Sequence, residues 1–289
     1  MWKKVVQLLG VVMMIVSGNA SAQTGDIPFH ELSVGNVNVR VVSLVQKDLN
    51  ASILLPGTAQ QKKAVADAYP DGAIHNVLNV LLLRAPGVAA LVDTGFDWTD
   101  AQMDAALRGA GLERKDVTHV IVSHAHGDHV GGLVKDGRAA FPSAVVLFPE
   151  RELSYWTGEA NRQAAKGGAV KIFENVANIA AAYKGRVATF EAGESVCAQL
   201  PGVLAVDEAG HTPGHVGIMI SGKDRTFLFW SDLLHAFDVQ EANPAVSTSF
   251  DMDPAAAARV REDMLNRARR GGWLVAGSHV PFTEPRVLK

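Results

Sequence analysis

The sequence has 289 residues, a formal net charge of −3 and one cysteine, Cys197. This length allows one large domain or two small ones and is ample for a buried core, and a lone cysteine cannot form an internal disulfide. The charge is mildly negative and not clustered, which argues against a nucleic-acid-binding protein and against a polybasic membrane-surface protein.

Residues 1–22 have the pattern of a secretory signal peptide. Two lysines make a basic start, residues 5–16 are an almost unbroken apolar run, and residues 20–22 (Ala-Ser-Ala) form a small-residue cleavage site. The run is short for a membrane span. We therefore expect a cleaved leader and a periplasmic or secreted mature chain over residues 23–289, with an uncleaved anchor as the alternative.

The first part of the mature chain is rich in predicted strands. Residues 31–46 alternate apolar and polar, which predicts a hairpin that turns near Gly35. Residues 48–75 are polar with little periodicity and predict a long loop near a functional site. The apolar runs 79–83 and 88–92 predict two central strands.

The next elements lead to a cluster of polar side chains. Residues 93–95 (Asp-Thr-Gly) end a strand, and Thr99 is expected to cap a helix that runs to about Ala110. Residues 117–122 predict another strand, which continues directly into residues 123–129, Ser-His-Ala-His-Gly-Asp-His. Three imidazoles and a carboxylate this close cannot share one strand face or one helix stripe, so they require a tight loop. A histidine-rich surface turn without metal is the alternative.

A helix is expected after the glycine pair at 131–132, and then a strand over 144–148. Pro149 begins a further helix that carries Tyr155 and Trp156. An aromatic pair just after a strand end is suited to line a substrate pocket, and core packing is the alternative. The alanine-rich residues 159–185 predict a helix or a lid.

The last part of the chain again predicts strands, followed by a long helix that begins at Pro254 and ends near Arg270. Three further motifs with histidine or aspartate lie at the expected strand ends. These are residues 210–215 (Gly-His-Thr-Pro-Gly-His), residues 229–232 (Phe-Trp-Ser-Asp) and residues 276–279 (Ala-Gly-Ser-His). The predicted strands cover residues 187–190, 203–209, 216–220, 226–230 and 273–277.

Together these motifs resemble the metallo-β-lactamase superfamily. Residues 124–129 are similar to its H-x-H-x-D-H signature, and the three later motifs follow in the order of the family. The resemblance implies an α+β fold, the αββα sandwich, in which two facing mixed β-sheets are flanked by helices. It also implies a single domain over residues 23–289 with metals at one sheet edge.

The resemblance further implies a dinuclear metal site. His124, His126 and His211 would hold the first metal, and Asp128, His129 and His279 the second, with Asp232 bridging both. Imidazoles and carboxylates without a thiolate favour zinc, and iron, manganese or cobalt remain open. We therefore expect two divalent metal ions, with zinc as the first choice.

Two metals about 3.5–4 Å apart can share one hydroxide, which provides a nucleophile at neutral pH. We assign catalytic roles to Asp128, which would guide a proton, and to Asp232. By resemblance, Asp93 would orient the metal loop through hydrogen bonds. His215 and His235 are expected to support the ligands from outside, with simple packing as the alternative for each.

The resemblance is closest to methyl parathion hydrolases and quorum-quenching lactonases, through residues 231–235 and 250–253. The classical β-lactamases of the superfamily lack an aspartate at the position of Asp232, which argues against a β-lactam as the main substrate. The active-site tyrosine of the lactonases has no counterpart here, because no tyrosine follows Tyr183.

We therefore expect an exported dinuclear metal-dependent hydrolase that cleaves ester, lactone or phosphotriester bonds of small molecules. The alternatives are a β-lactam-hydrolysing enzyme and a periplasmic metal-binding protein without hydrolytic activity. The expected partner is a small-molecule substrate, without nucleic acid or a stable membrane anchor, and a homodimer is compatible with the sequence.

Overall fold

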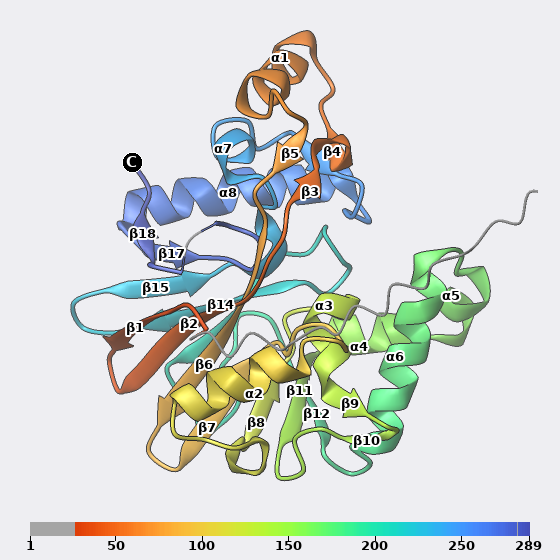
Figure 1. The fold of residues 1–289 in the computed structure, drawn as a ribbon, viewed down its shortest axis with the longest axis vertical. Coiled ribbons are helices and arrows are strands. Elements are labelled where there is room, and N and C mark those ends of the chain that lie inside the picture. The colour runs from red at the N-terminus through yellow and green to blue at the C-terminus, as the bar shows by residue number, and fades with distance from the viewer. Residues whose placement is uncertain (1–26, 282) are drawn as a thin grey trace, which may run out of the picture.

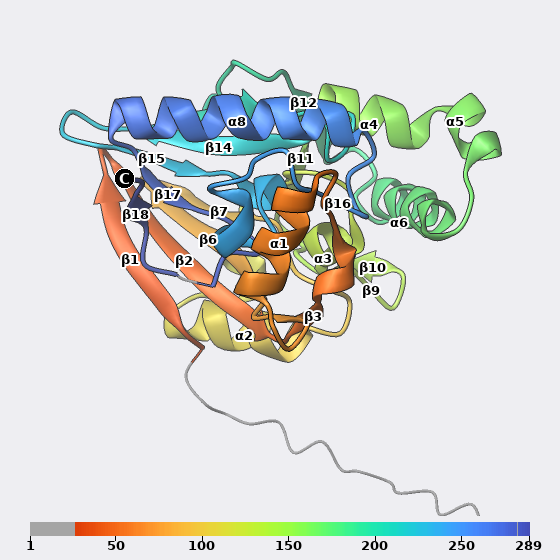
Figure 2. The same ribbon diagram turned by 90° about the horizontal axis from the view of Figure 1, so that it is seen from above.

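Two β-sheets pack face to face between outer helices in the computed structural model, which describes residues 27–281 and 283–289 (Figures 1 and 2). This architecture confirms the expected αββα sandwich. The expected signal peptide lies outside the described residues. Within the described residues, no helix has the length and apolar character that crossing a bilayer requires.

The first sheet has seven strands in the order β1-β2-β6-β7-β8-β11-β12. It is mixed, because β1, β2, β6 and β7 pair antiparallel and β7, β8, β11 and β12 pair parallel. The strand bounds are β1 Phe29–Val34, β2 Val37–Gln46, β6 Val77–Ala85, β7 Val88–Val92, β8 His119–Ile121, β11 Val145–Pro149 and β12 Val187–Phe190.

The second sheet has five strands in the order β13-β14-β15-β17-β18, of which only β15 and β17 pair parallel. Its strands are β13 Val203–Asp207, β14 Val216–Ser221, β15 Thr226–Phe229, β17 Leu274–Ala276 and β18 Arg286–Val287. Three two-stranded pairs complete the strands. They are β3 Leu49–Asn50 with β5 Ala73–Ile74, β4 Leu54–Leu55 with β16 Ser247–Thr248, and β9 Val134–Lys135 with β10 Arg138–Ala139.

The helices lie mainly outside the two sheets, and Figure 2 shows α8 along the second sheet and α2 on the opposite side, beyond the first. The α-helices are α1 Ala59–Ala68, α2 Asp100–Gly109, α3 Gly127–Val130, α4 Glu150–Thr157, α5 Glu159–Ala164, α6 Gly168–Ala182, α7 Phe237–Gln240 and α8 Pro254–Gly271. The 3₁₀ turns are η1 Ala51–Ile53, η2 Arg114–Asp116, η3 Gly131–Leu133 and η4 Ser231–Leu233.

Three apolar clusters correspond to the layers of the sandwich. Because successive side chains of a strand point to opposite faces, Leu81 and Leu83 of β6 pack against the second sheet, whereas Leu82 joins the layer below α2. On the other side, Leu228 packs with Met264 of α8. The apolar runs of the central strands therefore reflect burial on both faces.

The structure corrects two predictions about secondary structure. Residues 48–75 are not a plain loop, because they contain α1 and the short strands β3, β4 and β5. Thr58 and Gln61 form a capping box at the start of α1, a signal that the polar composition obscured. The helix expected after the glycine pair is also wrong. A single turn, α3, precedes these glycines, which lie in η3, and the hairpin β9–β10 follows.

Candidate active site

Most loops that carry the predicted ligands leave the sheets at the carboxyl ends of parallel strand pairs, whereas the turn of His211 joins the antiparallel strands β13 and β14. In the first sheet, β7 ends at Val92 and its parallel neighbour β8 ends at Ile121. In the second sheet, β15 and β17 form the corresponding pair. The amide of Val216 donates to the carbonyl of Ser123 over 3.1 Å, so the chain segments of the two halves are joined at this edge.

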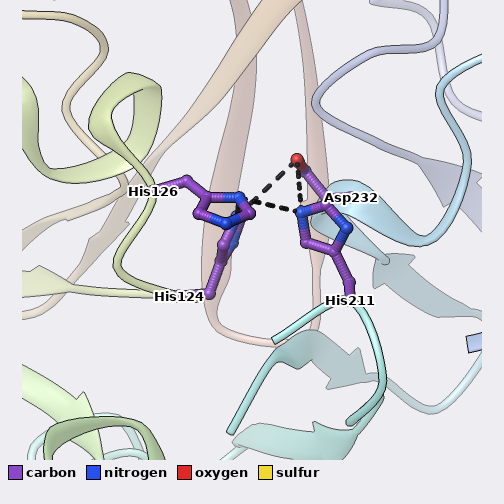
Figure 3. A group of neighbouring side chains, drawn as sticks. All are labelled: His124, His126, His211 and Asp232. Atoms are coloured by element: carbon purple, nitrogen blue, oxygen red, sulfur yellow. Dashed lines mark hydrogen bonds and ion pairs between the residues drawn. The ribbon is translucent and has the colours of Figure 1, made fainter. Parts of the chain in front are cut away.

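The structure brings the seven predicted metal ligands together in two groups, in each of which the ligand atoms lie within 4.8 Å of one another. The first group is His124, His126, His211 and Asp232 (Figure 3), and the second is Asp128, His129, Asp232 and His279. Asp232 belongs to both groups.

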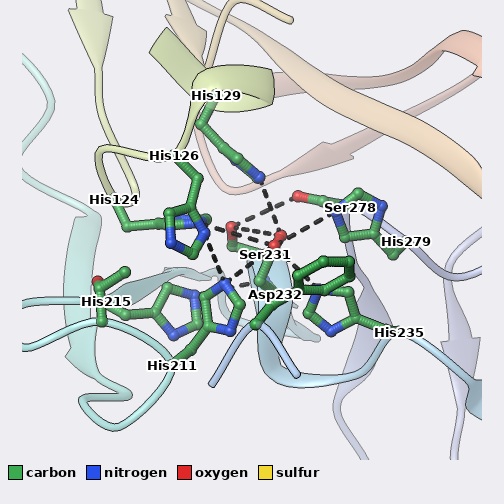
Figure 4. A network of polar contacts seen from close by, with 12 residues as sticks. His124, His126, His129, His211, His215, Ser231, Asp232, His235, Ser278 and His279 are labelled. Carbon is green, nitrogen blue, oxygen red and sulfur yellow. Dashed lines mark hydrogen bonds and ion pairs between the residues drawn. The ribbon is translucent and has the colours of Figure 1, made fainter. Parts of the chain in front are cut away.

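Asp232 lies at the centre of the ring of histidines that Figure 4 shows. Its Oδ2 is 3.3 Å from Nε2 of His211 and 3.2 Å from Nε2 of His279, and its Oδ1 is 3.1 Å from Nε2 of His129. The side chain of Asp232 is only 2% exposed. The preceding residue, Ser231, has a φ of 44°, an unusual conformation for a residue other than glycine that is typical of functional sites.

In several histidines, one ring nitrogen faces away from Asp232 and lies near a hydrogen-bond acceptor. The other ring nitrogen then faces the centre of the site. Nδ1 of His129 is 2.8 Å from Oδ2 of Asp93, and Nδ1 of His279 is 3.0 Å from the carbonyl oxygen of Val77. Nε2 of His129 is buried and points to the centre, 3.1 Å from Oδ1 of Asp232, but it does not meet the geometry of a hydrogen bond with any described residue. Such inward nitrogens, whose outer partners fix the tautomer, are what metal binding by imidazole requires, so the residues fit a pair of divalent metals.

Asp93 follows β7 of the first sheet and binds the histidine loop through hydrogen bonds. Its Oδ1 accepts a hydrogen bond from the amide of Ser123 over 2.8 Å, and its Oδ2 lies 2.7 Å from the Ser123 hydroxyl. The loop also packs closely against the turn that follows Asp93, because a Cβ on Gly132 would lie 2.4 Å from the carbonyl oxygen of Thr94. Asp93 therefore contacts both Ser123 and His129, and its role in orienting the metal loop stays a prediction.

Asp251 is a buried carboxylate that the sequence analysis did not assign to the site. Its Oδ1 lies 2.9 Å from Nδ1 of His211, and its Oδ2 accepts a hydrogen bond from the amide of Thr248. The guanidinium of Arg261, 1% exposed, contacts Asp251 Oδ2 at 3.3 Å. His211 therefore has an outer carboxylate of the kind that Asp93 provides for His129. The only sequence signal for Asp251 is its place in the block 250–253.

In the protein without bound metal, burial and the central carboxylates shift the pKa values of the histidines in opposite directions. Burial lowers the pKa of His126 to about 3. Burial also acts to lower the pKa of His279, but Asp232 and Asp128 outweigh it and raise this pKa to about 10. Burial opposes ionisation of Asp232, yet the surrounding histidines hold its pKa well below the usual range. The site therefore favours an ionised aspartate at its centre.

His215 and His235 both contact Asp232 but belong to neither group of ligand atoms. Nε2 of His215 accepts a hydrogen bond from the amide of Asp232 over 3.3 Å, and its Nδ1 lies 3.0 Å from the carbonyl oxygen of Glu208. Nε2 of His235 is 3.3 Å from Oδ2 of Asp232, and its ring stacks on that of His279. Both rings thus contact Asp232 directly, and their supporting roles stay a prediction beside the alternative of simple packing.

The two predicted pocket aromatics differ in burial. Trp156 is 2% exposed and packs with Ala125, Phe173 and Val176, while Tyr155 is half-buried beside it. The alternative of core packing therefore describes Trp156 in this structure. The assignment of both aromatics to a substrate pocket stays a prediction.

Comparison with known proteins places the chain in a family. The model of the metallo-beta-lactamase superfamily matches residues 76–279. Among curated proteins, metallo-beta-lactamase domain-containing protein 1 of Xenopus laevis is 42% identical over 83 residues, which are 27% of this chain and 35% of that protein. The same-named protein of Mus musculus is 33% identical over 104 residues, 36% of each chain. The matched part thus spans about a third of the length of these relatives.

Solved structures share the fold over nearly the whole chain. The hydrolase AbOPH of the beta lactamase superfamily superposes with a TM-score of 0.77 at 23% identity, covering 89% of this chain and 91% of its own. AidC, a dizinc quorum-quenching lactonase in complex with a product, N-hexnoyl-L-homoserine, gives a TM-score of 0.76 at 20% identity, covering 90% and 93%. At sequence identities this low, the similarity to these structures shows the fold alone.

Proposed function

Because this chain belongs to the metallo-β-lactamase superfamily, we propose that it is a dinuclear metal-dependent hydrolase of small molecules with ester, lactone or phosphotriester bonds. The observation that carries the proposal is the position of Asp232, whose carboxylate belongs to both ligand groups. A carboxylate shared in this way is suited to bridge two metals. Two bound metals, with zinc as the first choice, would supply a nucleophile from water at neutral pH and polarise the substrate.

The residues of the chain would position these components. The outer partners Asp93 and Asp251 keep His129 and His211 turned toward the centre. Asp128 is the more exposed of the two carboxylates in the ligand groups, because 18% of its side chain is exposed against 2% for Asp232. Its Oδ2 lies 3.3 Å from Nε2 of His279, so this carboxylate can hold a proton of the nucleophile or of the leaving group at the accessible side of the site.

Exposed apolar side chains next to the histidines support a substrate with an apolar part. The ring of Phe250 is 41% exposed and its centroid lies 5.5 Å from that of His235. Met252 is 42% exposed, and its amide donates to the carbonyl of His211. An aryl or acyl group on the scissile bond would contact this surface. The lactonase AidC, which shares the fold, was solved with the product N-hexnoyl-L-homoserine, which carries an acyl group, and this supports the proposal.

We also propose that the protein acts outside the cytoplasm, as the signal-peptide pattern of residues 1–22 indicates. After expression in bacteria, osmotic shock should release the protein with the periplasmic fraction. Its measured mass should be that of a chain that begins near Gln23. Retention of the full-length mass in the cytoplasm or the membrane would contradict export.

The hydrolase proposal is tested with a substrate panel on protein of measured zinc content. The panel contains p-nitrophenyl acetate, an aryl lactone, an acyl-homoserine lactone, a phosphotriester and a chromogenic cephalosporin. We expect turnover of at least one of the first four, loss on chelation and recovery with added zinc. His124→Ala and Asp232→Ala should lower both the bound metal and the rate. Two bound zinc ions without turnover of any substrate would favour a metal-binding protein without hydrolytic activity, and turnover of the cephalosporin alone would favour a β-lactamase.

A further inference from the structure

We propose that Glu152 is a positioning residue that fixes the first ligand group, by tying the loop of His124 and His126 to the turn of His211. The proposal rests on the metal binding proposed above. Glu152 lies on α4, outside every motif that the sequence analysis used, and its carboxylate is fully buried.

The carboxylate of Glu152 accepts four hydrogen bonds, two on each oxygen. Oε1 accepts from the amide of Ala125 over 2.9 Å and from the indole Nε1 of Trp156 over 2.8 Å. Oε2 accepts from the hydroxyl of Thr212 and from the amide of Gly214, each over 2.8 Å. One side chain therefore joins two loops that lie far apart in the sequence, with all of its acceptor positions in use.

The backbone around Glu152 also approaches the turn of His211 directly. A Cβ on Gly214 would lie 2.2 Å from the amide nitrogen of Glu152 and 2.6 Å from its Cα, so only glycine fits there. Trp156, one helical turn further along α4, packs against Ala125 on the other loop. The start of α4 thus lies between the two loops and contacts both, which restricts their separation.

The contacts of Glu152 reach only one of the two ligand groups. Ala125 stands between His124 and His126, and Thr212 directly follows His211. The second group is held by other partners, since His129 faces Asp93 and His279 faces the carbonyl of Val77. A change at Glu152 should therefore affect one metal and spare the other, a selectivity that a general loss of stability would not produce.

Glutamine at position 152 is a sharp test because it keeps the shape of the side chain. One carboxylate oxygen becomes an NH₂ group, which would face two hydrogen-bond donors of the chain instead of accepting from them. A buried donor left without an acceptor costs about 1–3 kcal/mol. Whichever way the amide is oriented, the contact with one of the two loops is lost.

Glu208 provides a matched control within the same part of the molecule. It is also buried, at 1% exposure, and its Oε2 lies 4.0 Å from Nε2 of His215. Neither of its carboxylate oxygens has a hydrogen-bond partner in the described part of the chain. Glu208→Gln therefore removes a buried carboxylate without cutting a link between ligand loops.

The experiment is a calorimetric titration of the metal-free full chain with Zn²⁺. We expect two sites in the unmodified protein and in Glu208→Gln, and about 10–100-fold weaker binding at one site only in Glu152→Gln. To identify that site, Glu152→Gln is combined with His279→Ala or with His126→Ala. The added change should weaken the remaining metal in the His279→Ala background and leave it unaltered in the His126→Ala background. Equal loss at both sites, or no loss, would overturn the proposal.

If Glu152→Gln does not fold, as judged by circular dichroism, Thr212→Val removes one donor to Oε2 and keeps the carboxylate. A several-fold weakening in the His279→Ala background alone supports the proposal, and an unchanged affinity there overturns it. Glu152→Asp should recover part of the affinity. Failure of the unmodified protein to bind Zn²⁺ would instead refute the proposed function, so the two failures can be told apart.

Discussion

Oδ1 of Asp251 lies 2.9 Å from Nδ1 of His211, opposite the ring nitrogen that faces Asp232. An outer carboxylate of this kind fixes the tautomer and the orientation of a metal-binding imidazole, and its loss typically costs 10–100-fold in metal affinity or activity. This pair leads to the first prediction.

Asp251→Asn should weaken binding of one Zn²⁺ by about 10–100-fold, because the amide cannot replace both the imidazole contact and the contact with Arg261. Titration calorimetry measures the change. Asp253→Asn is the matched control two residues away, since Asp253 accepts from the amide of Ala256 and caps α8. Asp253→Asn should lower the free energy of unfolding by at most about 1 kcal/mol and leave both zinc sites intact. Unchanged zinc affinity in Asp251→Asn would refute the role of the pair.

Trp156→Ala should lower the free energy of unfolding by about 3–5 kcal/mol, because it removes a large buried side chain and a hydrogen bond to Glu152. Urea unfolding of metal-free protein measures this effect apart from metal binding. Trp98→Ala, at a side chain that is 55% exposed, should change stability by less than about 0.5 kcal/mol. A stable Trp156→Ala protein with altered preference among aryl substrates would instead support the pocket role that the sequence suggested.

Phe250→Ala should raise KM for aryl esters several-fold more than for esters with a small acyl and alkyl part, because the exposed ring contacts His235 at the edge of the site. One lost apolar contact is typically worth about 1–3 kcal/mol in discrimination between substrates. Steady-state kinetics with a series of esters tests this. Val287→Ala, which trims an exposed side chain on β18, should leave the series unaltered. An equal effect on all substrates would argue against a contact of Phe250 with the aryl group.

Acid should destabilise the protein through its buried neutral histidines. Burial lowers the pKa of His215 to about 3 and that of His235 to about 4, from 6.5. Below pH 6.5 the unfolded chain therefore binds protons that the folded chain does not, so stability falls as the pH falls. Each of the two histidines should lower the free energy of unfolding by about 2 kcal/mol between pH 7.5 and pH 5.0.

Urea unfolding of metal-free protein at pH 7.5 and pH 5.0 measures this dependence. His215→Gln should reduce the loss of stability between the two pH values by about the share of one histidine, while the other titrating groups cancel in the comparison with the unmodified protein. An identical pH dependence in the two proteins would show that His215 does not titrate in this way.

The cluster of histidines and aspartates could be predicted from the sequence because each of these residues lies within a short motif near the end of an apolar strand. His124, His126 and His129 follow β8 within a few residues, and Asp232 and His279 follow β15 and β17 closely. Ligand chemistry and strand periodicity are both local signals, so the family resemblance and the sandwich fold could be recognised from them.

Asp251 and Glu152, which contact the ligands or their loops, could not be predicted in the same way. Asp251 is 40 positions from His211, and Glu152 is 60 positions from Thr212. Nothing local distinguishes Glu152 from a solvated glutamate near a helix start, because its burial follows from the packing of α4 against both loops. Conversely, the capping box of Thr58 and Gln61 was a local signal, and the polar composition around it led to the wrong prediction of a loop.

Because Asp232 belongs to both ligand groups, the site is complete only when the chain has folded. In an extended chain only the histidine loop offers several donors close together, whereas Asp232 and His279 arrive from the other sheet. On the proposed function, the full set of ligands for two metals is assembled only once the two sheets have met, so we expect tight metal binding to follow folding.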